Sequence, residues 1–384
     1  MPTDFAAAQR LFGPFGDRAW MNTAHQGPLP RPAAEAARGA IEDKQDPRRI
    51  ADEAFLEVPR RLRALLARLI GARPADVVLA NSTSYGLDLL AHGLALRPGD
   101  EVLIADNEFP ATVFPWLPLR RRGVELRTLP AAGGAPTPDE LAGALTERTR
   151  VVCSSWVFSF SGATAEVPAL VEVCRDRGDA VFVLNGSQTV GARPTDVAAL
   201  GVDALVCCGF KWLCGPYATG FAWLRPQLQD ALDYEQGYWL AQVDDIDRPP
   251  ERYELRDDLA AAAFDVFCTA NLATYPAWEQ AVALLLDVGL ERVEAHDQAL
   301  VQRLVDGLPA GWRLQSPSNR ELRSTLVFLE GRDPHLTESG ARELEAAGVD
   351  VAQRVGALRL SPHLHNTDHH VDRALEALAV AARA

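Results

Sequence analysis

From residue 77 to residue 223 the chain alternates short apolar runs with segments of helical spacing, and no other feature limits its possible folds as strongly. Residues 77–80, 181–185 and 204–208 are apolar almost throughout, which is typical of strands buried on both faces. Residues 169–178 have the spacing of a crossover helix. We therefore predict an α/β fold in which helices cover both faces of a mostly parallel (mixed) sheet. Right-handed crossovers place the turns after the strands on one edge, where ligands bind.

The 384 residues suffice for a large and a small lobe. We expect a short N-terminal helical segment over residues 1–20 and a large ligand-binding domain over residues 21–270. A connecting helix over residues 271–290 then leads to a smaller α+β domain over residues 291–384, where strand and helix patterns follow one another again. Within the large domain, apolar spacing predicts a helix over residues 33–71.

Charge and composition exclude several kinds of partner. The net charge is −14 and the acidic residues are spread along the chain, which argues against nucleic acid and an anionic membrane surface. No run approaches the ~20 apolar residues that span a bilayer, and we expect no signal peptide at the N-terminus. The cysteines form no C-x-x-C pair and most lie in apolar runs, so we interpret them as reduced thiols of a cytoplasmic protein. They are Cys153, Cys174, Cys207, Cys208, Cys214 and Cys268.

One lysine, Lys211, lies between the apolar runs ALVCCGF and WLCG, at the end of a predicted strand. Lysine is rarely buried without a partner or a role. An apolar setting lowers the pKa of an amine and makes it a candidate for Schiff-base chemistry. The local sequence fits equally well a lysine that extends from a strand end into water.

The wider stretch around Lys211 favours the first reading. Residues 185–221 contain four motifs in a fixed order. They are a strand-end position of the kind that carries an acid, G-x-Q, V-G-x-x-P-x-D-V-x-x-L-G-V-D and G-x-K-W-L-x-G-P-x-x-T-G-F. This order resembles aminotransferase class V, a family of fold type I enzymes that use pyridoxal 5′-phosphate (PLP). The resemblance implies that Lys211 carries PLP as a Schiff base and that Gln188 contacts its phenolic oxygen.

Three positions depart from the family pattern. Asn185 stands where the family has an aspartate that pairs with the pyridine nitrogen. Phe210 replaces a frequent histidine, and Cys208 replaces a frequent phosphate-binding serine. The resemblance still places Asn185 and Cys208 beside the cofactor.

Two further stretches complete the expected cofactor site. A Ser/Thr-rich turn follows the strand at 77–80 and opens a helix, whose N-terminus is suited to an anion. The same residues fit a plain helix cap; by resemblance, Thr83, Ser84 and less strongly Ser82 bind the PLP phosphate. The segment EFPATVFPW resembles epimerase-like members and kynureninases, which implies that Phe109 stacks on the pyridine ring.

The chain ends supply the expected substrate contacts. The segment AWMNTAHQGPLP resembles the family's N-terminal active-site segment, so Asn22, His25 and Gln26 are candidates to face the substrate. For His25 a polar turn before a helix explains the sequence equally well. The ending ALRLSPHLHNT resembles R-x-S-x-H-x-Y-N-T, which implies that Arg359 grips the substrate α-carboxylate.

Other positions bear on assembly and metals. The segment CTAN resembles the family's G-T-x-N, which implies that Thr269 binds the phosphate of the other subunit in a homodimer with shared sites. Trp156 and Phe158 stand where the family often has H-V-N or H-V-S. The C-terminal histidines lack a completing carboxylate or cysteine, so we expect helix-cap and surface roles and no metal. They are His363, His365, His369 and His370.

The neutral Asn185 guides the choice of reaction. It gives no charge to hold a proton on the pyridine nitrogen, and a weaker electron sink suits β-elimination better than transamination. No cysteine follows Cys268, which disfavours a desulfurase, and Thr112 replaces the acid of kynureninases. We predict a C–S β-lyase of specialised metabolism that acts on an S-substituted cysteine, with Lys211 as the base at Cα. The alternatives are decarboxylation-coupled oxidative deamination of a cysteine conjugate, as in lincosamide assembly, amino-acid epimerisation or transamination, and a catalytically degenerate PLP-binding regulator.

Overall fold

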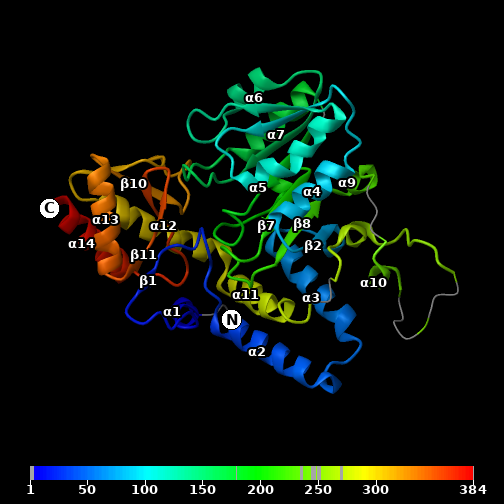
Figure 1. Cartoon of the computed structure of the whole chain (residues 1–384), viewed down its shortest axis with the longest axis horizontal. Coiled ribbons are helices and arrows are strands. Elements are labelled where there is room, and N and C mark those ends of the chain that lie inside the picture. Colours follow the sequence, from blue (N-terminus) through cyan, green and yellow to red (C-terminus); the bar gives the residue numbers. More distant parts are fainter. Residues whose placement is uncertain are drawn as a thin grey trace.

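The structure is a computed structural model that describes residues 4–178, 180–233, 237–243, 248, 252–268 and 271–383. Its centre is a seven-stranded sheet in the order β2-β8-β7-β6-β5-β3-β4, in which β8 runs antiparallel to both neighbours and the other pairs are parallel (Figure 1). The predicted mostly parallel α/β sheet is therefore confirmed. The strands are β2 (Val77–Ala80), β3 (Glu101–Ala105), β4 (Glu125–Leu129), β5 (Thr149–Ser155), β6 (Val181–Asn185), β7 (Ala204–Cys208) and β8 (Gly220–Leu224).

The two faces of this sheet bury two separate apolar cores, because successive side chains of a strand point to opposite faces. Phe182 and Leu205 belong to one core, and their neighbours Val183 and Val206 belong to the other. Helices cover both faces, which explains why the strands are apolar throughout. The helices of this part are α3 (Ala54–Leu69), α4 (Thr83–Gly93), α5 (Pro110–Val113), α6 (Pro138–Ala144), α7 (Val167–Arg177), α8 (Val197–Leu200), α9 (Pro226–Ala231), α10 (Trp239–Gln242) and α11 (Tyr275–Val288).

The helix predicted over residues 33–71 is wrong as one element. It is divided into α2 (Arg31–Gln45) and α3, with a short 3₁₀ turn at Pro47–Arg49 between them. Proline disfavours a helical conformation in the residue before it, so Pro47 ends the first helix at Asp46. The apolar spacing in the second half is real: Leu62 and Leu66 of α3 are fully buried.

The C-terminal part folds around its own sheet and core. Its four strands are antiparallel in the order β12-β13-β10-β9, and α12, α13 and α14 belong to the same region (Figure 1). The N-terminal strand β1 (Ala19–Trp20) pairs in parallel with β11 (Val349–Asp350). The remaining elements are α1 (Phe5–Gln9), β9 (Trp312–Leu314), β10 (Val327–Gly331), β12 (Ala352–Arg354), β13 (Ala357–Leu360), α12 (Leu290–Asp306), α13 (Pro334–Ala346) and α14 (Asp368–Arg383). Within the described ranges, no helix is both long and apolar enough to cross a bilayer.

Candidate active site

Lys211 lies in a tight turn between the central strands β7 and β8. The turn closes through backbone hydrogen bonds, from Gly209 N to Thr219 O at 2.8 Å and from Gly215 N to Gly209 O at 2.8 Å. A Cβ at Gly209 would come within 2.3 Å of Thr219 Oγ1, so the packing there admits only glycine. The turn thus holds the lysine backbone rigidly, while its side chain is half-buried and Nζ lies 5.3 Å from the ring centroid of Phe109.

The lysine faces a cavity of about 160 Å³ at the carboxyl ends of the parallel strands. Small polar groups and two aromatic rings line this cavity, and none of the described lining residues is acidic. Of the predicted cofactor ligands, seven line this cavity together with Lys211, and Thr269 lies outside the described residues. The lining residues are Ser82, Thr83, Ser84, Phe109, Ala111, Ser155, Ser159, Asn185, Ser187, Gln188, Cys208, Phe210 and Lys211.

Hydroxyl groups gather at one end of the cavity, where α4 begins. Ser82 is the N-cap and accepts a hydrogen bond from Tyr85 N at 3.1 Å, so the capping role considered from the sequence is present. Thr83 is buried and its Oγ1 lies 2.6 Å from Oγ of Ser187, whereas Ser84 is exposed. A helix N-terminus with several hydroxyls is suited to a phosphate.

The amide of Asn185 is held at the end of β6 by two hydrogen bonds. Its Oδ1 accepts from Ser187 N at 2.9 Å, and its Nδ2 donates to Thr112 Oγ1 at 2.8 Å. Glu108 lies behind this pair: it is buried, and it accepts from Ser155 Oγ at 2.6 Å and from Ser155 N. Burial raises the pKa of Glu108 to about 7 against the opposing hydrogen bonds from Ser155 and Thr112.

Gln188 connects the cavity to the lysine turn. Its Oε1 accepts from Nε1 of the fully buried Trp212 at 2.8 Å. Its Nε2 donates to Ala24 O at 3.1 Å and to Ser159 Oγ at 3.3 Å, at the wall of the cavity. Both N–H groups of Nε2 are thus engaged, and the Ser159 hydroxyl connects the amide to the cavity wall.

The N-terminal segment contacts both the lysine turn and the strand that carries Arg359, the residue expected to bind the substrate carboxylate. Gly27 N donates to Phe210 O at 2.9 Å, and Asn22 forms a parallel bridge with Ser361, two residues beyond Arg359. Asn22 is buried with an Oδ1 that has no partner among the described residues, and Gln26 Nε2 lies 3.3 Å from Nε2 of the exposed His25.

Arg359 is a buried cation on β13. Its Nε finds no hydrogen-bond partner within the described ranges, and burial lowers its pKa to about 10, with Arg354 adding repulsion. Partial burial and then the charges of Arg354, Arg359 and Lys211 also lower the pKa of His25. The charges of Arg354, Arg359 and Lys211 therefore act on one region near His25, which suits an anionic substrate group.

The helix-cap and surface roles expected for the C-terminal histidines are wrong for two of them. His363 is fully buried: its Nδ1 lies 2.7 Å from Asp297 Oδ2 and its Nε2 lies 3.2 Å from Trp212 O. The Asp297 carboxylate raises the pKa of His363 to about 10 against burial. His365 is also buried, which lowers its pKa to about 3. Among the described residues no group of three or more His, Cys, Asp or Glu could hold a metal.

Sequence reasoning missed several polar residues of the site. Ser155, Ser159 and Ser187 line the cavity, and Glu108 and Thr112 support Asn185. The signal for the serines is their position at the strand ends: Ser155 is the last residue of β5, and Ser159 and Ser187 lie in the turns after β5 and β6. Phe158, which was matched to the family's polar position, is instead fully buried in the core, so its neighbour Ser159 faces the cavity; Trp156 is also buried.

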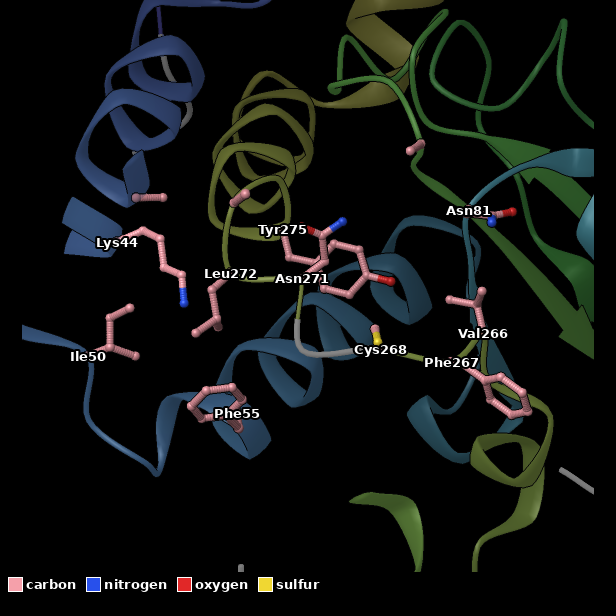
Figure 2. Close-up of a pocket in the computed structure, with 13 residues that line it drawn as sticks. Lys44, Ile50, Phe55, Asn81, Val266, Phe267, Cys268, Asn271, Leu272 and Tyr275 are labelled. Carbon is pink, nitrogen blue, oxygen red and sulfur yellow. The ribbon is translucent and has the colours of Figure 1, made fainter. Parts of the chain in front are cut away.

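A second, open cavity lies between α2, α3 and the start of α11. Figure 2 shows Lys44, Ile50 and Phe55 on one side and Val266 and Phe267 on the other. Its volume is about 510 Å³, and it reaches Asn81, the residue before the Ser82 cap. Cys268, at a φ of +61°, belongs to its wall, in a left-handed backbone conformation that glycine adopts most easily.

The class of protein follows from this cavity: it is a fold type I enzyme that uses PLP. Lys211, the hydroxyl-rich start of α4 and the ring of Phe109 surround the cavity, and none of its described lining residues is acidic. The group fits these residues. Thr83, Ser84 and Ser187 offer donors to its phosphate, Phe109 offers a face to its ring, and Lys211 offers the amine.

Comparison with known proteins gives the family. The sequence profile described as aminotransferase class-V matches residues 51–373, and the chain belongs to this family. A "Probable cysteine desulfurase" of Methanothermobacter thermautotrophicus is 26% identical, with 92% of both chains covered. The isopenicillin N epimerase of Streptomyces clavuligerus is 28% identical, with 93% of both covered.

Solved structures share the fold. The cystine C–S lyase C-DES, in complex with its product cysteine persulfide, has a TM-score of 0.83 at 20% identity and is covered to 98%, with 95% of this chain. The apo cysteine desulfurase of Thermococcus onnurineus has a TM-score of 0.84 at 19% identity, with 99% of both chains covered. The predicted family, fold type and cofactor are thus confirmed.

Proposed function

We propose that the protein is a C–S β-lyase that acts on an S-substituted cysteine. The observation that carries this proposal is the neutral amide of Asn185, which Ser187 and Thr112 fix at the position that the family resemblance assigns to an acid. A neutral partner weakens the electron sink, and β-elimination depends less on a strong sink because the sulfur leaves soon after the proton.

The chain's own residues divide the work. Arg359 binds the substrate carboxylate and Phe109 holds the cofactor ring in place, so that the Cα–H bond faces Lys211. Lys211 Nζ takes the Cα proton as general base; the Cβ–S bond then breaks, and its electron pair leaves with the sulfur as thiolate. PLP, when bound, supplies the electron sink for this step. Water converts the released enamine to pyruvate and ammonia.

The short hairpin of β12 and β13 supports a lyase over a desulfurase. Only Val355 and Gly356 connect the two strands, and no cysteine follows Cys268 in the sequence. The C-terminal region therefore offers no thiol to accept sulfur from a substrate. Sulfur is expected to leave as a free thiol or persulfide.

Product analysis of a panel of S-substituted cysteines tests the function. We expect pyruvate, ammonia and thiol in equal amounts, with the same yield with and without oxygen, and no product from Lys211→Ala. Oxygen-dependent release of carbon dioxide would instead support oxidative deamination. An inverted amino acid would support an epimerase, and a transaminated one would support a transaminase. If no amino acid were turned over, the protein would be a PLP-binding regulator without catalytic activity.

We also propose a homodimer in which a second copy covers the cavity of Figure 2. Phe267 is 59% exposed beside this cavity, and Ile50 and Phe55 line its other side. An apolar, open cavity next to the Ser82 turn is a suitable interface, because a partner there would lie close to the phosphate end of the site. The role of Thr269 toward the partner's phosphate belongs to this proposal.

A further inference from the structure

Glu108 is a buried carboxylate without a compensating cation. It precedes Phe109 directly, and among the described residues no Lys, Arg or His forms an ion pair with it. All its hydrogen-bond partners are neutral: the backbone and hydroxyl of Ser155, the hydroxyl of Thr112 and the backbone of Phe109. A buried acid with only neutral partners costs folding free energy when it is ionised, so a role in the site is the simplest reason for its presence.

The hydrogen bonds between Glu108 and the cavity have a fixed direction. Ser187 N can only donate, so it requires Oδ1 of Asn185 as its acceptor and turns Nδ2 toward Thr112. Thr112 Oγ1 accepts from Nδ2 and keeps its own hydrogen, and the Thr112 hydroxyl lies close enough to Glu108 to lower the pKa of that carboxyl as a donor. Every donor in this chain therefore points from the cavity toward the carboxylate.

An ionised Glu108 would polarise this chain. A negative charge at its far end draws the hydrogens of Thr112 and Asn185 toward itself and makes Oδ1 of Asn185 a stronger acceptor, an effect that a low dielectric increases. Asn185 Oδ1 has a second lone pair beyond the one that Ser187 N occupies. A strong acceptor at that place stabilises a protonated ring nitrogen.

We propose that Glu108 is a positioning residue that supplies, through Thr112 and Asn185, the negative charge that Asn185 lacks toward the pyridine nitrogen of PLP. The inference rests on the cofactor orientation used in the proposed function, with the pyridine nitrogen toward Asn185. It does not depend on the lyase reaction, and the two proposals are compatible. A charge relayed through two neutral side chains acts more weakly on the ring than a carboxylate in direct contact, so the electron sink stays weaker than an aspartate at position 185 would make it. It makes the protonation of the ring depend on whether Glu108 is ionised.

The other titratable group beside Glu108 does not compete for this role. Cys153 on β5 is fully buried, and burial followed by the charge of Glu108 raises its thiol pKa well above the usual range. It stays neutral near neutral pH. The buried Glu108, whose pKa is raised to about 7, therefore changes charge within the range where the enzyme can be titrated.

The test follows the pyridine nitrogen directly in the substrate-free holoenzyme, loaded with ¹⁵N-labelled PLP and titrated by NMR from pH 5.5 to 8.5. Glu108→Gln keeps the size of the side chain and removes its charge. Thr112→Val keeps Glu108 and breaks the chain to Asn185. We expect both variants to lower the pH of half-protonation of the nitrogen by roughly half a unit, less than the shift caused by a charge in direct contact, because Glu108 acts through two intervening side chains.

Two controls sharpen the result. Glu125→Gln removes an exposed carboxylate of β4 and should leave the titration unchanged. Asn185→Asp in the Glu108→Gln background places a charge directly at the ring and should restore protonation. An identical ¹⁵N titration in the parent, Glu108→Gln and Thr112→Val would overturn the inference; if Glu108→Gln fails to fold, Thr112→Val alone decides. Because no substrate is present, failure of the lyase proposal cannot produce this outcome.

Discussion

At the scale of single residues, Lys211 decides whether any of the chemistry is possible. Its amine lies near the Phe109 ring, and tight packing of the Gly209 turn fixes its backbone. We expect Lys211→Ala to lose the borohydride-reducible covalent link to PLP, measured by mass spectrometry of the intact protein. Loss of the base should also lower turnover roughly 10²- to 10⁴-fold. Lys211→Arg, which keeps the charge but not a nucleophilic amine, is the matched control and should show the same loss of the link. A PLP adduct that persists in either variant would contradict the assignment.

Glu108 gives a second prediction, which needs no cofactor. Its pKa is raised from 4.5 in the unfolded chain to about 7 in the fold, so the folded protein holds the proton more tightly. The stability due to its neutral form is full below pH 4.5 and is lost as the pH rises through about 7. At about 1.4 kcal/mol per pH unit, the loss over this interval is about 3 kcal/mol.

Urea unfolding of the apoprotein between pH 4.5 and 8 measures this loss. The free energy of unfolding of the parent should carry a downward contribution across this range that Glu108→Gln lacks. Equal pH profiles for the two proteins would show that Glu108 does not titrate in the fold, and would also weaken the inference on the pyridine nitrogen.

At the scale of elements, the strand ends explain what could be predicted from the sequence. Apolar runs fixed the buried strands, and the polar residues that follow them, such as Asn185 and Lys211, had to meet at one edge of a parallel sheet. The contact between Asn185 and Thr112 could not be predicted, because it joins β6 to α5 across 73 positions of the chain. The sequence also could not show that Ser159, and not Phe158, faces the cavity. The turn after β5 decides the direction of these side chains, and its conformation could not be predicted.

The next prediction concerns Arg359 on strand β13. In Arg359→Gln the substrate carboxylate loses a charge-assisted partner worth about 1.5–3 kcal/mol, which corresponds to a roughly 10- to 100-fold lower kcat/KM. Steady-state kinetics should show the change mainly in KM. Arg354→Gln, on the neighbouring strand β12 and exposed, is the control and should have a smaller effect. Equal losses for the two variants would argue that general positive charge, and not a specific contact of Arg359, binds the substrate.

The pair of His363 and Asp297 connects α12 to the lysine turn and gives a prediction on stability. Both side chains are fully buried, and His363 also contacts the carbonyl of Trp212. Asp297→Ala leaves a buried cation without its partner, which should cost about 3–5 kcal/mol. Chemical denaturation measures the cost, and Asp372→Ala, at an exposed ion pair with Arg303, is the control expected to lose about 1 kcal/mol or less. A loss as small as that of the control would mean that the buried pair is not ionised.

At the scale of the whole molecule, substitutions in the cavity of Figure 2 test whether the protein is a monomer or a dimer. Exposed apolar side chains next to the phosphate end of the site favour a second copy there, and a charge placed among them should prevent association because it would be buried without a partner. We expect Ile50→Asp and Phe267→Asp to shift the mass measured by light scattering from two chains to one. Val380→Asp is the matched control, since Val380 is 47% exposed on α14, which does not line this cavity.

Cofactor affinity then shows whether the partner completes the site. If a residue of the second copy binds the phosphate, the monomeric variants should hold PLP less tightly than the parent, while Val380→Asp should not. A monomeric parent, or a dimer that survives both aspartate substitutions, would place the interface elsewhere. A monomeric variant with unchanged PLP affinity would show that Thr83, Ser84 and Ser187 bind the phosphate without help from a partner.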